Sequence, residues 1–306
     1  MSKVYQTITD TIIRQIEAGA GKFEMPWHTK GSRGGSIYPV NAKTGTDYNG
    51  MNVITMWAAG KAKSYTSNVW ATYRQWQELG AQVRKGEKST HGIYWKEMSA
   101  ASAAGDDQQD TPARPGKRLV GFGFSVFCAD QVDGWDGSRG GKPVDRTDRT
   151  ARLAHADAVI AGSGASITHE GIKAFYRPST DQVHMPERWR FIGTATADAT
   201  TCYYSTLLHE LTHWTGHESR LNRERVKRFG DEAYAFEELI AEIGAAFACA
   251  RLGIENEPRI DHAAYVQSWL KVLRNDPRAI ITAASKAQKA CDFIVNRLAA
   301  PAAMAA

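Results

Sequence analysis

The segment His209-Glu210-Leu211-Thr212-His213 has the residue types and the spacing of a zinc site that activates water. Residues four apart on an α-helix lie about 40° apart around its axis, so both imidazoles project to one side and can bind one Zn²⁺. Glu210 lies beside them without being a ligand, and its carboxylate can accept a proton from metal-bound water and deliver it to a leaving amine. The motif therefore predicts a zinc-dependent peptidase, in which Mn²⁺ can take the place of Zn²⁺.

The third ligand of such a site is expected on the helix that follows. Gly216 ends the motif helix within a turn of His213, which lets the chain turn back and bring another residue to the metal. The next helix, 234–253, is largely apolar but carries Glu238 and Glu242 on one face. Burying carboxylates there is costly unless they are paired or bound to metal. We therefore expect Glu238 to be the third ligand and Glu242 to accept a hydrogen bond from a ligand imidazole.

Three other residues compete for the role of third ligand. Glu242 and Glu237 lie on the same helix as Glu238, but Glu237 is about 100° round the helix from it and has no acidic partner at i+4. His217 follows His213 by four residues and should lie past the end of the helix. Three ligands beside a free carboxylate leave an open coordination position, which favours catalysis over a purely structural metal site.

Other polar residues of this half have less specific interpretations. The histidines outside the motif are expected on the surface or in the core: His155, His169, His184 and His262. Three tyrosines are candidates for stabilising an oxyanion, with no basis for choosing between them: Tyr203, Tyr204 and Tyr265. In 171–191, two short strands flank a polar turn, and zinc peptidases commonly hold an extended substrate as an added strand at such an edge.

The first third of the chain carries the excess positive charge. Residues 1–98 hold 13 Lys and Arg against 7 Asp and Glu, a net charge of +6, whereas the whole chain has a net charge of +5. The same third contains five of the nine tryptophans and six of the eleven tyrosines. Cations that follow phosphates, together with rings that stack on bases, are typical of proteins that bind single-stranded nucleic acid.

Three segments supply the residues expected to contact DNA. Two are loops rich in Gly, Pro and Asn, 25–35 and 41–50, and the third is the turn 83–88. Their candidate residues are Trp27, Lys30, Arg33, Lys43, Tyr48, Arg84, Lys85 and Lys88. Trp70 and Trp76 fall at helical spacing, and we expect both to pack inward instead.

The composition indicates a folded chain, its length favours two domains, and the pattern of helices and strands indicates an α+β fold. Of the 306 residues, 42% are hydrophobic and 23% charged, which excludes a disordered or fibrous protein. The expected domains are a DNA-binding domain (1–133) with a flexible loop at 99–118, a linker (134–150) and a zincin-like domain (151–306). No apolar run is long enough to cross a membrane, so a soluble, cytoplasmic protein is expected. The four cysteines lack metal-site spacing and are expected to be reduced.

Hydrophobic periodicity gives the elements of both domains. In the first domain, helices are expected at 4–18, 52–61 and 68–79, and strands at 90–97 and 119–132. In the second domain, a helix at 150–162 and strands at 165–169, 172–177 and 181–185 precede four helices, at 200–217, 231–252, 261–274 and 277–298.

Several motifs together resemble those of the ArdC-type antirestriction proteins of conjugative plasmids, which are related to the N-terminal part of the TraC primases. They are YYSTLLHELTHWTGHESRLNR, AYAFEELIAEIGAAF and DHAAYVQSWLKVLRNDPRAI in the second half, and PWH, NAKTGTDYNGMN, WATYRQWQELGAQVRKGEKST and VFCADQVDG in the first. The resemblance covers nearly all of residues 4–298, and loop 99–118 is the main stretch without a match. It implies a domain that binds single-stranded DNA followed by a zincin metallopeptidase domain. It matches His209 and His213 to the zinc histidines and Glu210 to the catalytic acid/base.

The resemblance implies protection of incoming plasmid DNA from host restriction, and two mechanisms are compatible with the sequence. The protein is either a working peptidase recruited to DNA, where it would cleave a host protein, or a shield that coats DNA, with a structural or regulatory zinc domain. A two-metal nuclease ranks low because no Asp/Glu cluster of that type occurs outside the zinc motif.

Overall fold

Two compact units make up the chain, and they divide it differently from the expected domains. The computed structural model describes residues 3–19, 25–28, 38–99, 117–137, 148–194, 197–223, 232–255 and 265–299. One unit comprises residues 1–15 and 39–142, and the other comprises 16–38 and 143–306. Residues 16–38 therefore belong with the second unit, although the sequence suggested the first. Most of the predicted loop 99–118 and linker 134–150 lies outside the described residues.

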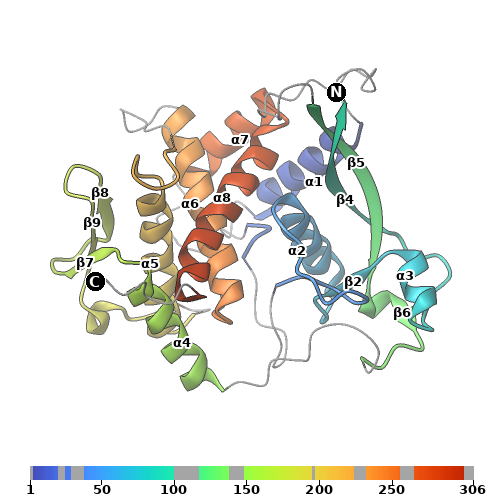
Figure 1. The fold of residues 1–306 in the computed structure, drawn as a ribbon, viewed down its shortest axis with the longest axis horizontal. Helices are drawn as coiled ribbons and strands as arrows, with labels where there is room; N and C mark the ends of the chain where they lie inside the picture. Colours follow the sequence, from blue (N-terminus) through green and yellow to red (C-terminus); the bar gives the residue numbers. More distant parts are fainter. Residues whose placement is uncertain are drawn as a thin grey trace. The chain divides into compact units, whose positions relative to one another are not determined.

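The first unit is built on a sheet whose described strands have the order β1-β2-β5-β4 (Figure 1). Strands β1 and β2 are parallel, and the other neighbours are antiparallel. Strands β3 and β6 form a separate ladder. The elements of this unit are β1 (Val40–Asn41), α2 (Met51–Lys63), β2 (Val69–Ala71), α3 (Tyr73–Glu78), β3 (Gln82–Val83), β4 (Thr90–Ser99), β5 (Lys117–Cys128), the 3₁₀ helix η3 (Ala129–Gln131) and β6 (Val132–Asp133). Helix α1 (Lys3–Gly19) begins in this unit and ends in the second.

Strands β4 and β5 form a long hairpin that α2 holds at one point. The ladder pairs residues from Thr90 with Val126 to Ser99 with Lys117. The Asn52 side chain of α2 bonds to both backbone groups of Ile93, donating to its oxygen (2.8 Å) and accepting from its nitrogen (2.7 Å). This double hydrogen bond fixes the strand against the helix.

One predicted helix of this unit is wrong in part. Trp70 and Trp76 are 2% and 0% exposed, so both pack inward as expected, but Trp70 lies in β2 and only Trp76 lies in α3. The helix begins after Thr72 because Thr72 and Gln75 cap it reciprocally, with hydrogen bonds of 3.2 and 3.0 Å. The three residues before Thr72 instead pair with β1 and β5.

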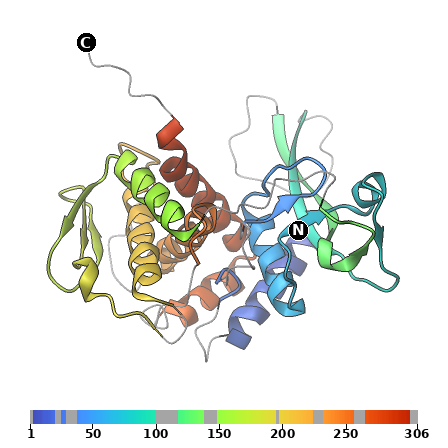
Figure 2. The ribbon, with the colours of Figure 1, turned by 90° about the horizontal axis from the view of Figure 1, so that it is seen from below.

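Helices α5, α6 and α8 form the centre of the second unit, and Figure 1 shows them side by side. The sheet has the order β7-β9-β8, and its strands β8 and β9 contact α5 on the side away from α6 (Figure 1, Figure 2). The elements are α4 (Arg149–Gly162), β7 (Ser166–His169), β8 (Phe175–Arg177), β9 (Gln182–Met185), η4 (Arg188–Arg190), α5 (Ala199–Thr215), α6 (Glu232–Arg251), α7 (Val266–Asn275), α8 (Ala279–Val295) and η6 (Asn296–Ala299).

A glycine sets the distance between α5 and α6. A Cβ atom added to Gly244 of α6 would lie 2.6 Å from Cγ2 of Thr212 on α5. Thr212 is fully buried, and its hydroxyl donates to the Leu208 carbonyl oxygen of its own helix (2.8 Å). The two helices can therefore approach closely only because residue 244 lacks a side chain.

Where the described residues allow the comparison, the other expected elements agree with the structure to within a few residues at each end. The start of the predicted helix 261–274 lies outside the described residues. Helix α5 ends at Thr215 with Gly216 as its C-cap, as expected. Gly216 has a φ of −74°, however, so it is not the left-handed glycine of a typical C-cap. A Cβ there would lie 2.9 Å from Nη2 of Arg223, so this glycine leaves room for the guanidinium. None of the described helices is both long and apolar enough to cross a membrane.

Candidate metal centre and nucleic-acid interface

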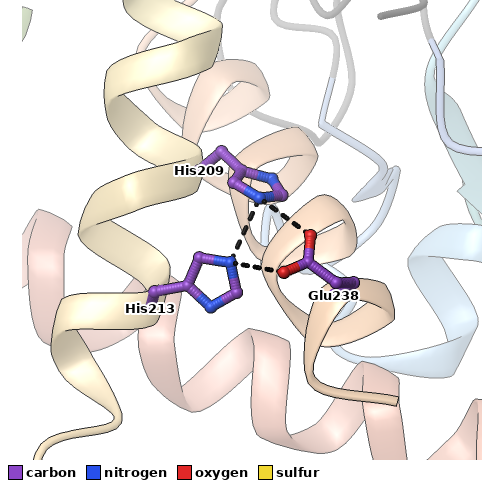
Figure 3. A group of neighbouring side chains, drawn as sticks. All are labelled: His209, His213 and Glu238. Atoms are coloured by element: carbon purple, nitrogen blue, oxygen red, sulfur yellow. Dashed lines mark hydrogen bonds and ion pairs between the residues drawn. The ribbon is translucent and has the colours of Figure 1, made fainter. Parts of the chain in front are cut away.

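Three side chains from α5 and α6 point at one another (Figure 3). Nε2 of His209 lies 3.2 Å from Nε2 of His213, and the Glu238 carboxylate lies 3.5 Å from the first nitrogen and 3.3 Å from the second. Within the part of the chain that the structure describes, this is the one group of three or more His, Cys, Asp and Glu side chains whose ligand atoms lie within 4.8 Å of one another.

The donor set fits a small divalent cation. Zinc binds imidazole nitrogen and carboxylate oxygen at about 2.0–2.2 Å, so neighbouring ligand atoms of a tetrahedral site are about 3.3–3.6 Å apart. The three observed separations, 3.2, 3.3 and 3.5 Å, lie in or close to this range. His209 and Glu238 are buried, and His213 is half-buried. One side of the triad therefore remains for a water molecule or a substrate.

Both ends of α5 are fixed, which positions the two histidines. At its start, the Asp198 carboxylate caps the helix by accepting a hydrogen bond from the backbone of Thr201 (2.7 Å). At its end, Arg223 donates to the Thr212 carbonyl oxygen (2.5 Å) and to the Thr215 hydroxyl (2.8 Å). The Thr212 carbonyl also accepts a hydrogen bond from the Thr215 hydroxyl (2.6 Å), so the guanidinium adds a second donor at the last turn of the helix.

Two further glutamates of α6, Glu237 and Glu242, lie at the second nitrogens of the two imidazoles. Oε1 of Glu237 is 3.4 Å from Nδ1 of His213, and Oε2 of Glu242 is 3.6 Å from Nδ1 of His209. Carboxylates in these positions fix the tautomer and the orientation of ligand histidines. Of the three glutamates, only Glu238 is beside both Nε2 atoms.

The histidines and Glu238 of the triad shift one another's pKa values, because opposite charges lie close together. Burial lowers the pKa of His213, but the charge of Glu238 and hydrogen bonds to Glu237 and Glu238 raise it to about 10. Burial raises the pKa of Glu238, but His213 and His209 lower it well below its usual range. A cation that enters the site therefore replaces the proton that the carboxylates hold on His213.

Glu210 and two tyrosines lie close to the triad. Glu210 is buried on α5, and its charge contributes to the raised pKa of His213. Tyr234 was not expected from the sequence, and its pKa is raised by burial, by its contact with Tyr265 and by the charge of Glu238. Its hydroxyl is 3.4 Å from that of Tyr265. Position 234 is four residues before Glu238, so helical spacing could have identified it.

The remaining tyrosines and histidines have partners away from the triad. Tyr203 contacts His169 (2.9 Å), and Tyr204 donates to Asp157 (2.7 Å). His184 is buried against Phe175 with a ring separation of 4.6 Å, and His155 is exposed. His217 lies past the end of α5, where its ring contacts the Ser219 hydroxyl (2.8 Å). His262 lies outside the described residues.

Comparisons with known proteins give the family. The family described as the N-terminal domain of anti-restriction factor ArdC matches residues 2–127, and a family of zincin-like metallopeptidases matches residues 154–286. The crystal structure of the antirestriction ArdC protein from the R388 plasmid, in its metal-free form, has 38% sequence identity and a TM-score of 0.73, covering 97% of this chain and 98% of that chain. This chain belongs to the ArdC antirestriction family.

The chain is also similar to a metal-bound form of the R388 protein, to a relative of similar length and to part of a longer primase. The Mn(II)-bound structure of the same R388 protein is 39% identical with a TM-score of 0.70, covering 97% of this chain and 99% of that chain. The uncharacterized protein y4eC of Sinorhizobium fredii (strain NBRC 101917 / NGR234) is 44% identical over 294 residues, 95% of this chain and 91% of that protein. A DNA primase TraC of Escherichia coli is 40% identical over 304 residues, but they form only 27% of the primase.

The match to the ArdC N-terminal domain, residues 2–127, contains all eight residues expected to bind DNA, and the structure contradicts one of them. Trp27 is 0% exposed and packs edge-on against Trp269 of the second unit, with ring centres 6.0 Å apart. A buried ring cannot stack on a base, so Trp27 is a core residue. Lys30 and Arg33 lie outside the described residues.

The other expected DNA-binding residues differ in how available their charges are. Lys43 forms an ion pair with Glu78, and Tyr48 is half-buried, with its hydroxyl bonded to Asn41 (2.9 Å). Arg84 pairs with Glu87 (3.2 Å) and Asp133 (3.5 Å), which offsets its charge. Lys85 and Lys88 are exposed. A hollow of about 680 Å³ beside this turn is lined by Tyr73, Gln82, Val83, Arg84, Lys85, Gly86, Glu87, Phe127 and Asp133.

The β4–β5 hairpin carries a row of rings that was not expected from the sequence. Tyr94 pairs with Phe122 across the ladder, and their rings stack with centres 5.4 Å apart. Phe124 lies beside Tyr94 (6.3 Å) and stacks on Tyr48 (6.3 Å). Tyr94 is 50% exposed. The alternation Gly-Phe-Gly-Phe at 121–124 was the available signal, because alternate residues of a strand share a face.

The charge contrast between the two units is smaller than the contrast between residues 1–98 and the rest of the chain. Residues 1–15 and 39–142 hold 15 Lys and Arg against 11 Asp and Glu, a net charge of +4, and the second unit holds 23 against 22, a net charge of +1. Moving 16–38 to the second unit transfers positive charge with it. The first unit nevertheless remains the more basic one.

Proposed function

We propose that this chain binds single-stranded DNA through its first unit, carries a zinc metallopeptidase site in its second, and protects incoming plasmid DNA from host restriction. The observation that carries the peptidase proposal is the convergence of His209, His213 and Glu238, with mutual distances of 3.2–3.5 Å, beside the buried carboxylate of Glu210. Zinc is the proposed ion, and Mn²⁺ is a proposed substitute, since Mn(II) binds the R388 relative.

In this proposal, His209, His213 and Glu238 hold the ion, which lowers the pKa of a bound water molecule towards neutrality. Glu210 accepts the proton of the attacking water and delivers it to the leaving amine. Glu237 and Glu242 orient the two imidazoles through their Nδ1 atoms. Tyr234, kept protonated by its raised pKa, is the proposed donor to the developing oxyanion.

The proposed substrate is an extended segment of a host protein. Strand β8 is an edge strand of the β7-β9-β8 sheet and contacts α5, the helix that carries both histidines. An edge strand can accept a peptide as an added strand through backbone hydrogen bonds. This arrangement would bring a peptide backbone to the helix that carries Glu210.

For DNA, the proposed surface combines rings and cations of the first unit. The rings of Tyr94 and Phe122 form a stacking platform on the β4–β5 hairpin. Lys85 and Lys88, on the turn before β4, supply exposed positive charge. Stacking is independent of sequence and needs unpaired bases, so single strands are favoured over duplex.

A Glu210→Gln substitution tests the peptidase. The purified protein and the variant are incubated with single-stranded DNA and candidate host proteins, and cleavage and zinc content are measured. We expect the variant to keep its zinc and lose cleavage by orders of magnitude, because Gln cannot accept the proton. The exposed Glu218 of the same unit, changed to Gln, is the matched control. Cleavage that survives Glu210→Gln would contradict the proposed role.

Transfer of a plasmid that carries the Glu210→Gln gene into a restricting host separates the two mechanisms. Loss of protection with unchanged DNA affinity means that cleavage is the mechanism. Protection that persists means that the chain acts as a shield on DNA.

A further inference from the structure

A histidine from the N-terminal part of the chain lies behind the metal centre. Nε2 of His28 is 3.0 Å from Oε1 of Glu242, and the other oxygen of Glu242 is 3.6 Å from Nδ1 of His209. The side chains of His28 and Glu242 are 5% and 4% exposed. His28 is thus in contact with the carboxylate that faces the imidazole of a proposed ligand.

The backbone fixes the tautomer of His28. The N–H of Met25 donates to Nδ1 of His28 (2.9 Å), so in the neutral ring the hydrogen is on Nε2. That hydrogen points to Glu242, and the carboxylate accepts it without a charged imidazole. The result is a directed series of interactions from the Met25 backbone through His28 and Glu242 to His209.

The segment that carries His28 is anchored in the interior of the second unit. Met25 and Trp27 are 2% and 0% exposed, and Trp27 packs on Trp269 of α7. The His28 backbone also donates to the Met25 carbonyl oxygen (3.1 Å), which closes a tight turn. Residues 25–28 fall within the family match of the N-terminal ArdC domain, 2–127, and outside the zincin-like match, 154–286.

We propose that His28 belongs to the metal centre, as a positioning residue that holds Glu242 against Nδ1 of His209. This inference rests on the proposed metal site. A carboxylate as buried as that of Glu242 is costly without donors, and its orientation determines whether His209 presents Nε2 to the ion. Hence a zincin domain cut at the boundary of its own family match would lack one of its supporting residues.

Zinc affinity of the full-length chain tests the proposal, measured by competition with a chromophoric chelator. We expect His28→Phe to weaken zinc binding about 10–100-fold, the usual effect of removing such a partner. His28→Gln should recover most of this affinity, because its amide offers both a donor and an acceptor. Trp27→Phe, in the same buried segment, is the matched control and should bind zinc like the wild type. Far-UV circular dichroism verifies that each variant is folded.

A double-variant cycle separates positioning from general stability. If His28 acts through Glu242, adding a His28 substitution to Glu242→Ala should change zinc affinity by less than about twofold. The visible spectrum of the Co²⁺-loaded protein should shift in His28→Phe and return in His28→Gln. If His28→Phe does not fold, His28→Ala, which also lacks the donor, gives the same cycle.

Additive effects in the cycle, wild-type affinity in His28→Phe, or equally weakened zinc binding in Trp27→Phe would overturn the proposal while leaving the metal site intact. A wild-type chain that binds neither zinc nor manganese would overturn the metal site itself, and this inference with it.

Discussion

Oε1 of Glu237 lies 3.4 Å from Nδ1 of His213 and accepts a 2.8 Å hydrogen bond from Nη2 of Arg223. Arg223 also bonds to the last turn of α5, the helix that carries His213. The guanidinium therefore connects the end of that helix to a carboxylate on α6. The pair Arg223–Glu237 therefore supports His213 from behind, as the pair His28–Glu242 supports His209.

Replacing Glu237 should weaken metal binding without abolishing it. We expect Glu237→Ala to lower zinc affinity about 10–100-fold, because His213 loses the acceptor that orients it. Glu238→Ala should weaken binding far more, since it removes a proposed ligand. Competition with a chromophoric chelator measures both. If Glu237→Ala abolished zinc binding while Glu238→Ala retained it, the proposed ligand and supporting roles would be reversed.

Adding a methyl group at Gly244 should separate the two helices that carry the triad. The new Cβ would lie 2.6 Å from Thr212, so Gly244→Ala should destabilise the second unit by about 1–3 kcal/mol and weaken zinc binding. Gly60→Ala in α2, where nothing lies within 4 Å, is the control and should be neutral or stabilising by up to about 1 kcal/mol. Urea unfolding measures both. Equal effects of the two substitutions would contradict this explanation of helix spacing.

The N-cap of α5 gives a prediction that depends on pH. The pKa of Asp198 is lowered, first by the hydrogen bond from the Thr201 backbone and also by Arg149. A lowered pKa means that the ionised cap stabilises the fold above the unfolded pKa of about 4, and that this contribution is lost as the pH falls through the lower folded value. Asp198→Ala should therefore cost about 1 kcal/mol at pH 7.

The comparison with Asp198→Asn isolates the charge, because Asn caps a helix at every pH. The stability gap between wild type and Asp198→Ala should narrow as the pH is lowered below about 4, whereas the gap between Asp198→Asn and Asp198→Ala should not. Urea unfolding at stepwise lower pH measures both gaps. If both stability gaps changed with pH in the same way, ionisation of the Asp198 carboxylate would not be the cause of the pH dependence.

Local periodicity predicted the part of the site that lies on one helix. The i,i+4 spacing of His209 and His213 requires only α-helical geometry, and α5 provides it. Glu238 was expected near the two histidines because a carboxylate in an apolar helix needs a partner. This pattern does not indicate which residue the partner is. The hydrogen bond between His28 and Glu242 joins residues 214 positions apart, and no local pattern indicates such a pairing.

The wrong predictions concern residues whose local sequence pattern is compatible with two different structures. Trp70 and Trp76 are at helical spacing, but Trp70 is on a strand, because sheet pairing with Cys128 and the Thr72 cap outweigh the periodicity. Trp27 lies in a segment rich in loop-forming residues and was expected to face a ligand. Its indole is instead buried in the second unit, since a large apolar side chain is stabilised by packing wherever the fold allows it.

The row of rings on the β4–β5 hairpin gives the sharpest test of DNA binding. Tyr94 and Trp95 are neighbours on β4, 50% and 37% exposed, and their side chains point to opposite faces of the strand. Tyr94 stacks on Phe122, its partner across the ladder. We expect Tyr94→Ala to weaken binding of single-stranded DNA by about 1–3 kcal/mol if a base stacks on the platform, and Trp95→Ala to change it little.

Fluorescence anisotropy with a labelled oligonucleotide, at several salt concentrations, measures these affinities and separates rings from charges. Tyr94→Ala should lower affinity at every salt concentration without changing the slope of log K against log salt. Replacing Lys85 and Lys88 by Ala should flatten that slope by about 0.7 for each phosphate that is no longer neutralised, because each neutralised phosphate releases counterions from the strand. Duplex DNA should bind more weakly and respond little to Tyr94→Ala, since its bases are already stacked. Equally weakened binding in the Tyr94 and Trp95 variants, or equal affinity for duplex, would rule out this face of the hairpin as the stacking surface.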